Sequence, residues 1–384
     1  MYSMIQFLKL YGMKQKPNLL FLLLLLFTES CIEPFTPPEI TGARQYLVVD
    51  GFLNTSPNQE SQFRLTRTQT IAETGQPMPE SRARLFVEGD AGSRFTLSET
   101  ANGLYILPPI AAKDNEKYRI HILTQDGNEY YSSYEPIIRT PAIDSLTYEV
   151  REDRSGVQIN INTHDPRNAT RFYRWNFEET WQYYSDMYSP VEYINGAVVG
   201  RLQDISTCWS FAKSSRIVLG TSVKLSQDII KDQPITYVAA ATGKLKVKYS
   251  VLVRQYGLSQ EEYEYWTTLA KTTEGTGTLF DPQPSQVRGN IMCVSDPSAL
   301  VFGYFSASTQ QEERLFVAES LGRYATSCAP VDTLSLGELA ESFDKISEEY
   351  IPTGSTQTLY VMAFESCVDC RLRGGTTVRP PFWR

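Results

Sequence analysis

Few residues of this 384-residue chain have the types and spacing that catalysis requires. It contains two histidines, His121 in a predicted strand and His164 in a Thr-His-Asp-Pro turn, and neither accompanies a nucleophile motif such as Gly-x-Ser-x-Gly. There is no His-Glu-x-x-His motif and no zinc-spaced Cys/His set. Gly243-Lys244 lacks the remainder of a P-loop. A serine or zinc hydrolase and a nucleotide hydrolase are therefore not indicated.

Paired carboxylates are the chemistry that a histidine-poor chain could still perform, because two Asp or Glu residues suffice for glycoside cleavage. Glu178 and Glu179 lie beside Trp175 and Trp181, which suits contact with a sugar. Adjacent strand residues point to opposite faces, however, so these two carboxylates cannot flank one bond. The more ordinary interpretation is that these tryptophans and Trp209 are core residues and that Glu178 is a solvated strand position.

The cysteines have a pattern that favours structural disulfides. Cys367-Val-Asp-Cys370 has the spacing of a redox motif, but it follows a strand and does not open a helix of a βαβ unit. We predict bridges from these two cysteines to Cys208 and Cys328. Cys293 lies in the apolar run Asn-Ile-Met-Cys-Val and is predicted to be unpaired and buried.

The stretch from Lys14 to Cys31 predicts an attachment to a membrane. Two lysines precede an apolar run, Leu19 to Phe27, that is too short for the roughly 20 residues of a bilayer span. The pattern resembles a bacterial lipoprotein signal, in which the cysteine receives a diacylglycerol thioether before cleavage. We predict a signal peptide at residues 1–30 and lipid on Cys31, with translation starting at Met1 or Met13. No cofactor is expected besides this lipid.

Composition limits the remaining possibilities. The chain has a net charge of -8, which makes it a poor partner for nucleic acid. Its length favours two domains, and its 12% aromatic content with 23 tyrosines favours strands. A proline-rich stretch at residues 31–42 would form a tether between the lipid and the folded domains.

The fold class is predicted to be mainly β with minor α. Short alternating strands and a hairpin turn at Asp126-Gly127 predict an immunoglobulin-like or transthyretin-like β-sandwich at residues 43–140. A larger β-rich α+β domain with two covering helices is predicted at residues 141–384. The helices are Ser259–Lys271 and Ser335–Glu349, since each begins with a capping box, formed with Glu262 and with Glu338.

The stretch Arg171–Trp181 is predicted to be a long strand with two unlike faces. One face is mostly aromatic and is predicted to be core: Tyr173, Trp175, Phe177, Glu179 and Trp181. The other face is more polar: Phe172, Arg174, Asn176, Glu178 and Thr180.

From Cys31 to Trp383 the chain resembles a Bacteroidota lipoprotein family known as domain of unknown function 4249. The likeness rests on several short stretches: Cys31-Ile-Glu-Pro-Phe, Leu-Val-Val-Asp-Gly-Phe, Tyr-Arg-Trp-Asn-Phe-Glu-Glu-Thr-Trp, Thr207-Cys208-Trp209, Glu-Tyr-Glu-Tyr-Trp with the following Phe-Asp-Pro-Gln-Pro-Ser-Gln, Gly-Tyr-Phe-Ser-Ala-Ser, and the C-terminal segment from Cys367. The resemblance implies an outer-membrane lipoprotein, on the periplasmic face or the cell surface, that associates with a TonB-dependent β-barrel receptor. It implies no established activity.

We therefore expect a non-enzymatic accessory or binding subunit with a glycan or peptide as a possible ligand. Trp209, Asp281 and Gln283 are candidate contacts with a ligand or partner, and no metal site is expected. A surface glycan-binding or glycan-cleaving lipoprotein is the alternative function.

Overall fold

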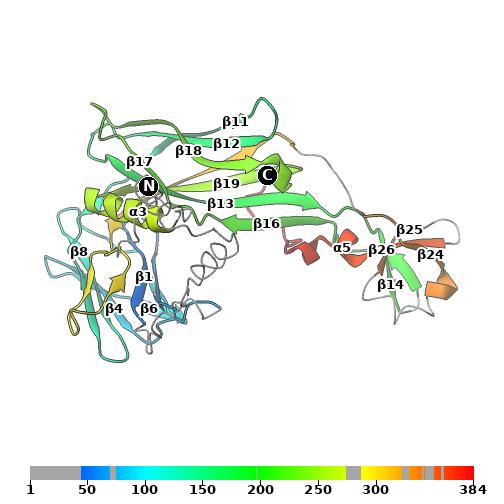
Figure 1. The fold of residues 1–384 in the computed structure, drawn as a ribbon. Coiled ribbons are helices and arrows are strands. Elements are labelled where there is room, and N and C mark those ends of the chain that lie inside the picture. The colour runs from blue at the N-terminus through cyan, green and yellow to red at the C-terminus, as the bar shows by residue number, and fades with distance from the viewer. Residues whose placement is uncertain are drawn as a thin grey trace, which may run out of the picture. The chain divides into compact units, whose positions relative to one another are not determined.

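The computed structural model describes residues 45–69, 75–195, 197–273, 287–321, 328–339, 341, 350–355 and 359–384 (Figure 1). The predicted signal peptide, the tether and Cys31 lie outside these described residues. Within them the chain is mainly β with few helices, as the sequence predicts.

The first β-sandwich consists of two five-stranded sheets. Its strands are β1 (Leu47–Gly51), β3 (Ser61–Arg67), β4 (Arg84–Gly89), β5 (Arg94–Thr96), β6 (Ser98–Ala101), β7 (Leu104–Leu107), β8 (Tyr118–Leu123), β9 (Glu129–Ser132), β20 (Ile291–Cys293) and β21 (Val301–Phe302). The sheet orders are β21-β1-β3-β7-β6 and β20-β9-β8-β4-β5. Alternation builds the core, because Phe63 and Leu65 are buried while Gln62 and Arg64 are exposed. The predicted hairpin is present as β8 and β9, with Gly127 at a φ of +85°.

Two strands of this sandwich come from the far part of the chain. β21 pairs in parallel with β1, and β20 pairs antiparallel with β9. The core accordingly includes Ile291, Val301 and Phe305. The predicted boundary near residue 140 follows the last of the early strands, but the first sandwich is completed only by residues 291–305.

The second β-sandwich has its own core. Its strands are β11 (Ile143–Val150), β12 (Gly156–His164), β13 (Phe172–Tyr184), β16 (Thr207–Lys213), β17 (Val218–Thr221), β18 (Ile229–Ala239), β19 (Lys248–Leu258) and β23 (Gln310–Val317). One sheet has the order β11-β12-β18, and the other has the order β16-β13-β19-β23 with β17 also paired to β13. Val157 and Ile159 of β12 share one hydrophobic core with Tyr173, Trp175 and Phe177 of β13. The aromatic face predicted for Arg171–Trp181 is therefore confirmed as core.

Smaller elements complete the described chain. The short strands β2 (Leu53–Asn54), β10 (Ile137–Ile138) and β22 (Ala307–Ser308) form one sheet, β14 (Val191–Ile194) and β15 (Ala197–Gly200) form a hairpin, and β24 (Asp332–Ser335), β26 (Leu359–Phe364) and β25 (Tyr350–Ser355) form a C-terminal sheet. The short helices are η1 (Ala240–Thr242), α5 (Glu365–Val368) and η2 (Cys370–Arg373). A small core cluster around Ala363 and Val368 packs beneath the C-terminal sheet.

Helix α3 (Gln260–Thr273) corresponds to the predicted helix Ser259–Lys271. The Ser259 hydroxyl caps it by accepting the Glu262 backbone N–H at 3.1 Å. In the second predicted helix, Ser335 and Glu338 form the expected capping bonds and residues 336–339 are helical. Most of the remainder of that helix lies outside the described residues.

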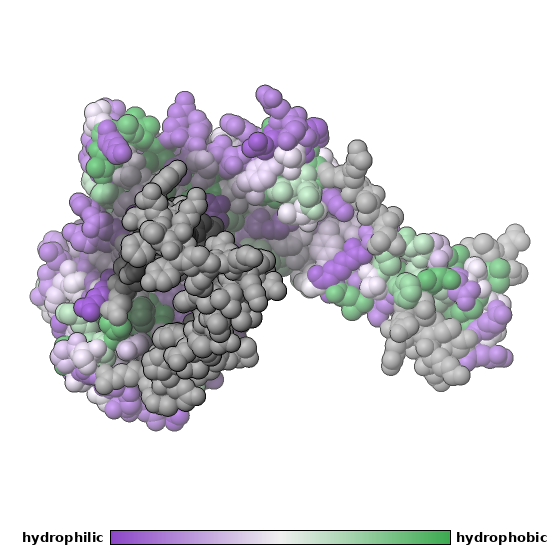
Figure 2. All heavy atoms as spheres, viewed as in Figure 1, coloured by the Kyte–Doolittle hydropathy of each residue, from purple (hydrophilic) through white to green (hydrophobic). Residues whose placement is uncertain are grey.

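On the face of the molecule drawn in Figure 2, polar residues are frequent over the sandwiches. Figure 2 shows hydrophilic residues gathered over the strands of both sandwiches, with smaller hydrophobic groups between them. Among the described residues, no helix has the length and apolar character that crossing a bilayer requires.

Candidate functional site

Four cysteines form the two disulfides that the sequence predicts, and the structure defines the pairing. Cys208 is bonded to Cys370, and Cys328 is bonded to Cys367. The CxxC cysteines thus bond to separate upstream partners and crosslink the C-terminal segment to the rest of the chain. Cys293 is free and buried, as predicted.

Of the three predicted contact residues, the structure describes only Trp209. Trp209 is only 8% exposed, and its indole meets Trp383 edge-on with the ring centroids 6.5 Å apart. Such burial fits the core role that the sequence allowed and leaves little indole surface for a ligand. Asp281 and Gln283 lie outside the described residues, as does the predicted lipidation site Cys31.

Both histidines are held by neighbouring carboxylates. The two ring nitrogens of His121 lie 3.0 Å from Glu88 Oε1 and 2.9 Å from Glu129 Oε1. His164 Nδ1 lies 2.7 Å from Asp144, which raises the pKa of His164. In the described part of the chain, neither imidazole has a serine or cysteine side chain among its hydrogen-bond partners.

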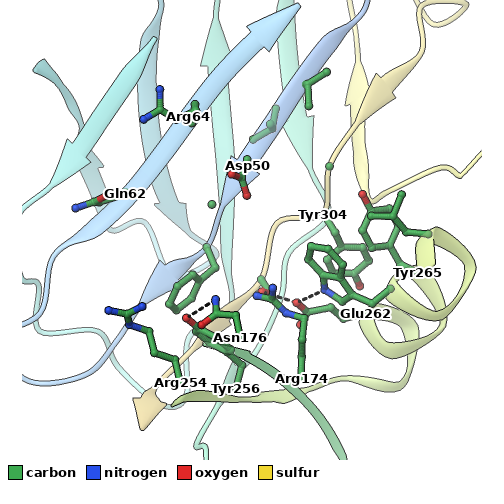
Figure 3. A pocket seen from close by; sticks show the side chains of 18 of the residues that line it. Asp50, Gln62, Arg64, Arg174, Asn176, Arg254, Tyr256, Glu262, Tyr265 and Tyr304 are labelled. Atoms are coloured by element: carbon green, nitrogen blue, oxygen red, sulfur yellow. Dashed lines mark hydrogen bonds between the residues drawn. The ribbon is translucent and has the colours of Figure 1, made fainter. Parts of the chain in front are cut away.

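A cavity of about 650 Å³ lies where helix α3, strands β1, β13 and β19 and the segment 302–306 meet (Figure 3). This volume is within the usual range of small-molecule sites. Charged side chains that line it include Arg174, Glu178, Arg254 and Glu262, and aromatic ones include Phe52, Tyr256, Tyr265, Trp266 and Tyr304.

Strand alternation brings the polar residues of the cavity to one face of the second sandwich. Arg174 lies directly opposite Tyr256 in the β13–β19 ladder, and Asn176 lies opposite Arg254. Since side chains on one face of paired strands are neighbours, these four groups form a single polar patch. The same strand turns Trp175 to the opposite face, where it enters the core.

Helix α3 and the segment after β21 form the other side of the cavity. Tyr263 of the helix contacts Phe172 with ring centroids 5.0 Å apart, and Tyr265 contacts Tyr304 at 5.4 Å. Gly303 allows the segment to approach β1 closely, because an added Cβ would lie 2.1 Å from the Val49 carbonyl oxygen. Both elements therefore cover a strand face that would otherwise meet solvent.

Glu178 is bound within an ion-pair network. Its Oε1 lies 2.9 Å from Arg254 and 3.7 Å from Lys213, and Arg254 Nε also donates to Glu312 at 2.7 Å. Burial works to raise the pKa of Glu178, but the hydrogen bond and charge of Arg254 outweigh it, so the pKa lies below its ordinary value. Glu179 points to the other face and pairs with Lys244 at 2.6 Å, which confirms that the two carboxylates are separated.

Glu262 turns its carboxyl group inward from the first turn of α3. The side chain is 3% exposed, and its Oε1 accepts hydrogen bonds from Trp266 Nε1 at 3.1 Å and from Ser306 Oγ at 3.0 Å. Burial raises the pKa of Glu262, and this effect outweighs the opposing influence of the Arg174 charge and of the two hydrogen bonds. The cavity thus contains two carboxyl groups whose pKa values are moved in opposite directions.

Two polar atoms of the cavity wall have no hydrogen-bond partner within the described residues, and both are buried. They are Arg174 Nε and Asn176 Oδ1. The Asn176 Nδ2 group donates to the Tyr256 hydroxyl at 3.3 Å, which leaves the amide oxygen as the open position. Figure 3 shows both side chains at the same end of the cavity as Tyr256 and Glu262.

Sequence reasoning missed this site as a unit, although it separated the two faces of β13 correctly. The sequence places Arg174 and Asn176 on the polar face of the strand and gives Glu262 only a capping role. The four-residue spacing of Glu262 and Trp266 was the one local sign of an inward contact, since residues i and i+4 of a helix are neighbours. Across the described residues, no group of three or more His, Cys, Asp or Glu side chains could hold a metal ion.

Residues 32–314 match the family described as "Domain of unknown function (DUF4249)". No curated protein matches the chain. A two fibronectin type III domain segment from chicken tenascin has 13% identity and a TM-score of 0.16, with 55% of this chain and 91% of that chain covered. A DUF4785 family protein from Legionella pneumophila has 8% identity and a TM-score of 0.19, with 54% and 52% covered. Likenesses at these TM-scores carry no argument about function.

Proposed function

The chain belongs to the DUF4249 family, and on this premise we propose that it is a non-enzymatic accessory or binding subunit of the bacterial outer membrane. In this proposal lipid on Cys31 anchors the protein, and a TonB-dependent β-barrel receptor is its partner. The observation that carries the binding role is the cavity beneath helix α3.

The signal-like stretch before Cys31 supports the anchor. Its lysines, short apolar run and terminal cysteine are the features that a lipoprotein signal combines. Two or three acyl chains hold a protein on a membrane, at about 0.8 kcal/mol per buried CH₂ group, whereas one chain is marginal. The acidic, strand-built domains would then stand on the membrane through the proline-rich tether.

The lining of the cavity supports binding. It presents the guanidinium of Arg174, the amide of Asn176 and several aromatic rings to one volume. The aromatic rings can contact an apolar part of a ligand, and the polar groups can fix its orientation. A ligand held there would be presented beside the partner receptor.

Recovery of the partner tests the anchor and the partnership together. We expect affinity capture of the chain from detergent-solubilised outer membranes to recover a β-barrel receptor in stoichiometric amount, and mass spectrometry to find acyl groups on Cys31. Cys31→Ala should remove the acyl groups and shift the protein to the soluble envelope fraction. Capture without any barrel protein, or an unmodified amino end on the native protein, contradicts the proposal.

One observation favours the second candidate, a surface glycan-binding or glycan-cleaving protein. Glu178 and Glu262 line the same cavity, and carboxyl groups with separated pKa values are typical of acid and base pairs. The binding function is preferred because Arg254 and Lys213 engage Glu178, while Trp266 and Ser306 engage Glu262.

Glycan arrays and hydrolysis assays separate the two candidates. Glycan cleavage that Glu262→Gln and Glu178→Gln each abolish would establish the second function. Unchanged behaviour of both variants, in binding and in cleavage, removes it.

A further inference from the structure

Arg174 lines the cavity with a guanidinium that has few polar partners. Among the described residues its Nε–H has no acceptor, and no Asp or Glu oxygen forms an ion pair with its guanidinium. A buried donor without a partner costs free energy, and the cost is greater for a charged group. A ligand that supplied the missing acceptor would remove this cost.

Two aromatic rings hold this guanidinium in place. Its Cζ lies 4.3 Å from the ring centroid of Trp266 and 4.7 Å from that of Tyr256. Contact with ring faces stabilises the positive charge without using the N–H donors, which lie at the edge of the guanidinium plane. The donors are therefore oriented and still available to a planar acceptor.

Glu262 is a weak counter-charge for Arg174. The two groups influence each other electrostatically, but burial raises the pKa of Glu262 and favours its uncharged form. Its Oε1 is already engaged by Trp266 and Ser306. Glu262 therefore interacts with Arg174 through its charge, but among the described residues the two side chains form no ion pair.

Arg254 is an arginine in the same cavity whose guanidinium does form ion pairs. It pairs with Glu178 at 2.9 Å and with Glu312 at 2.7 Å. Arg254 and Arg174 lie on neighbouring strands and line one volume, so they differ in partners and not in general location. The contrast indicates that the missing partner of Arg174 is specific to that position.

Asn176 adds an acceptor beside this donor. Its Oδ1 is buried without a partner within the described residues, while its Nδ2 is used by Tyr256. A ligand with an N–H or O–H group next to an anionic group would satisfy both open positions. Aromatic residues such as Phe52, Tyr265 and Tyr304 line the remainder of the volume and suit an apolar ligand body.

We propose that the cavity binds a small organic molecule through one carboxylate group, which Arg174 receives, while Asn176 Oδ1 accepts an adjacent N–H or O–H of the ligand. A carboxylate matches the planar fork of the guanidinium donors, and competition with inorganic phosphate decides between the two anions. The inference rests on the proposed function only in that both place a ligand in this cavity.

Paired probes that differ only in charge test this assignment. The full chain in detergent is titrated by calorimetry with N-acetyl-L-phenylalanine and with its uncharged primary amide. We expect the acid to bind about tenfold or more tightly than the amide, since a charge-assisted hydrogen bond is lost with the amide. Arg174→Gln should weaken binding of the acid about 10- to 100-fold and leave the amide within about twofold.

Arg151→Gln is the matched control, because the guanidinium of Arg151 also lies over an aromatic ring, that of Tyr237, but outside the cavity. It should preserve the preference for the acid. Arg174→Lys is a second variant that keeps the charge but loses the planar fork, and it should reduce the preference only in part. Thermal unfolding of each variant verifies that the fold is retained.

Several outcomes overturn the assignment. They are equal binding of acid and amide by the wild type, unchanged binding of the acid by Arg174→Gln, displacement of the acid by equimolar inorganic phosphate, and no binding of the acid up to about 10 mM. None of them affects capture of a barrel receptor or lipid on Cys31, so the anchor and the partnership in the proposed function stand or fail separately.

Discussion

In the first half of strand β13, the two faces differ in whether their polar side chains have hydrogen-bond partners. On the inner face the Tyr173 hydroxyl donates to Asp228, and Trp175 Nε1 donates to Gln255 Oε1 at 2.8 Å. On the outer face Arg174 Nε and Asn176 Oδ1 have no partner among the described residues. These residues alternate along one strand, so the difference comes from what covers each face.

The polar side chains of the inner network, Gln255 and Asp228, have further hydrogen-bond partners. Gln255 Nε2 donates to the Pro141 carbonyl at 2.9 Å and to Thr163 Oγ1 at 3.0 Å. Asp228 also accepts the Ser222 hydroxyl and the Asp165 backbone N–H. Buried networks in which every polar group has a hydrogen-bond partner help to specify a fold. Buried donors and acceptors without a partner beside a cavity lower the stability of the protein, but a ligand can bind to them.

The largest effect is expected from opening the closed network. Asp228→Ala removes the acceptor of Tyr173, Ser222 and the Asp165 N–H, all in a region from which water is excluded. We expect the free energy of unfolding to fall by about 3–5 kcal/mol. Urea unfolding followed by circular dichroism measures this change.

Glu152→Ala is the control for this prediction, since Glu152 is exposed and the variant also removes one negative charge. It should change the free energy of unfolding by less than about 0.5 kcal/mol. A similar small change for Asp228→Ala would contradict the structural role of the inner network.

Asp165 gives the same network a dependence on pH. Its carboxylate accepts the backbone N–H groups of Arg167, Ala169 and Thr170 at 2.9–3.0 Å. Burial works to raise the pKa of Asp165, but these donors and the Arg167 charge outweigh it, so the pKa lies below the ordinary 3.8. A lowered folded pKa contributes stability above pH 3.8 that is lost as the pH falls through the folded value.

Asp165→Asn should therefore cost more near neutral pH than in acid. We expect a loss of about 2 kcal/mol near pH 7 that shrinks as the pH falls below the ordinary carboxyl pKa. Urea unfolding of both proteins across that range measures the difference. A loss that stays constant with pH would show that the ionised form of Asp165 is not what the backbone donors stabilise.

Sequence periodicity predicts the inner face of β13 well, because alternation of Tyr173, Trp175 and Phe177 reports burial directly. It cannot predict the outer face, where the polar residues look solvated. The cover comes from α3 and from β1, which lie far away along the chain, and strand alternation contains no information about such partners. The sequence predicts that these strands exist, but not that residues 291–305 complete the first sandwich.

Local sequence motifs likewise do not predict tertiary contacts. The capping pattern of Ser259 and Glu262 predicts where α3 begins, yet the Glu262 carboxyl group turns toward Trp266 and Ser306. The four disulfide cysteines are predictable from their number, but which CxxC cysteine meets Cys208 depends on tertiary structure. Cys370 does so because the backbone after η2 pairs with Trp209 through Thr376.

Removing the Arg174 charge should change the free energy of unfolding little or increase it slightly. Arg174→Met keeps a long apolar side chain between Trp266 and Tyr256 and removes an unpaired buried donor. We expect the free energy of unfolding to stay equal or to rise by up to about 2 kcal/mol. Arg254→Met should instead lose about 1–3 kcal/mol, because it removes the ion-pair partner of Glu312 and leaves Glu178 with the more distant Lys213.

Urea unfolding of the two variants in parallel tests the distinction between these arginines. Equal losses would show that both guanidiniums serve the fold, and the comparison between the faces of β13 would then not hold for Arg174. A stable Arg174→Met protein that no longer prefers the acid probe would support the contrast between the two faces of β13. It would show that Arg174 contributes to ligand binding and not to the stability of the fold.

The smallest effect is expected at Glu262. Burial raises its folded pKa above the ordinary 4.5, so its contribution to stability is full below pH 4.5 and declines as the pH rises through the folded value. Glu262→Gln keeps an oxygen acceptor for Trp266 and Ser306 and has no charge to bury. We expect it to be more stable than the wild type near pH 7, by less than about 1 kcal/mol, and equal to it in acid. Because the variant removes a carboxyl group that interacts with Arg174 and would compete with a ligand carboxylate for it, the acid probe should bind to the variant at least as tightly. Weaker binding of the acid by Glu262→Gln would mean that an ionised Glu262 helps to hold the Arg174 guanidinium, and that the outer face of β13 is more nearly closed than its hydrogen bonds indicate.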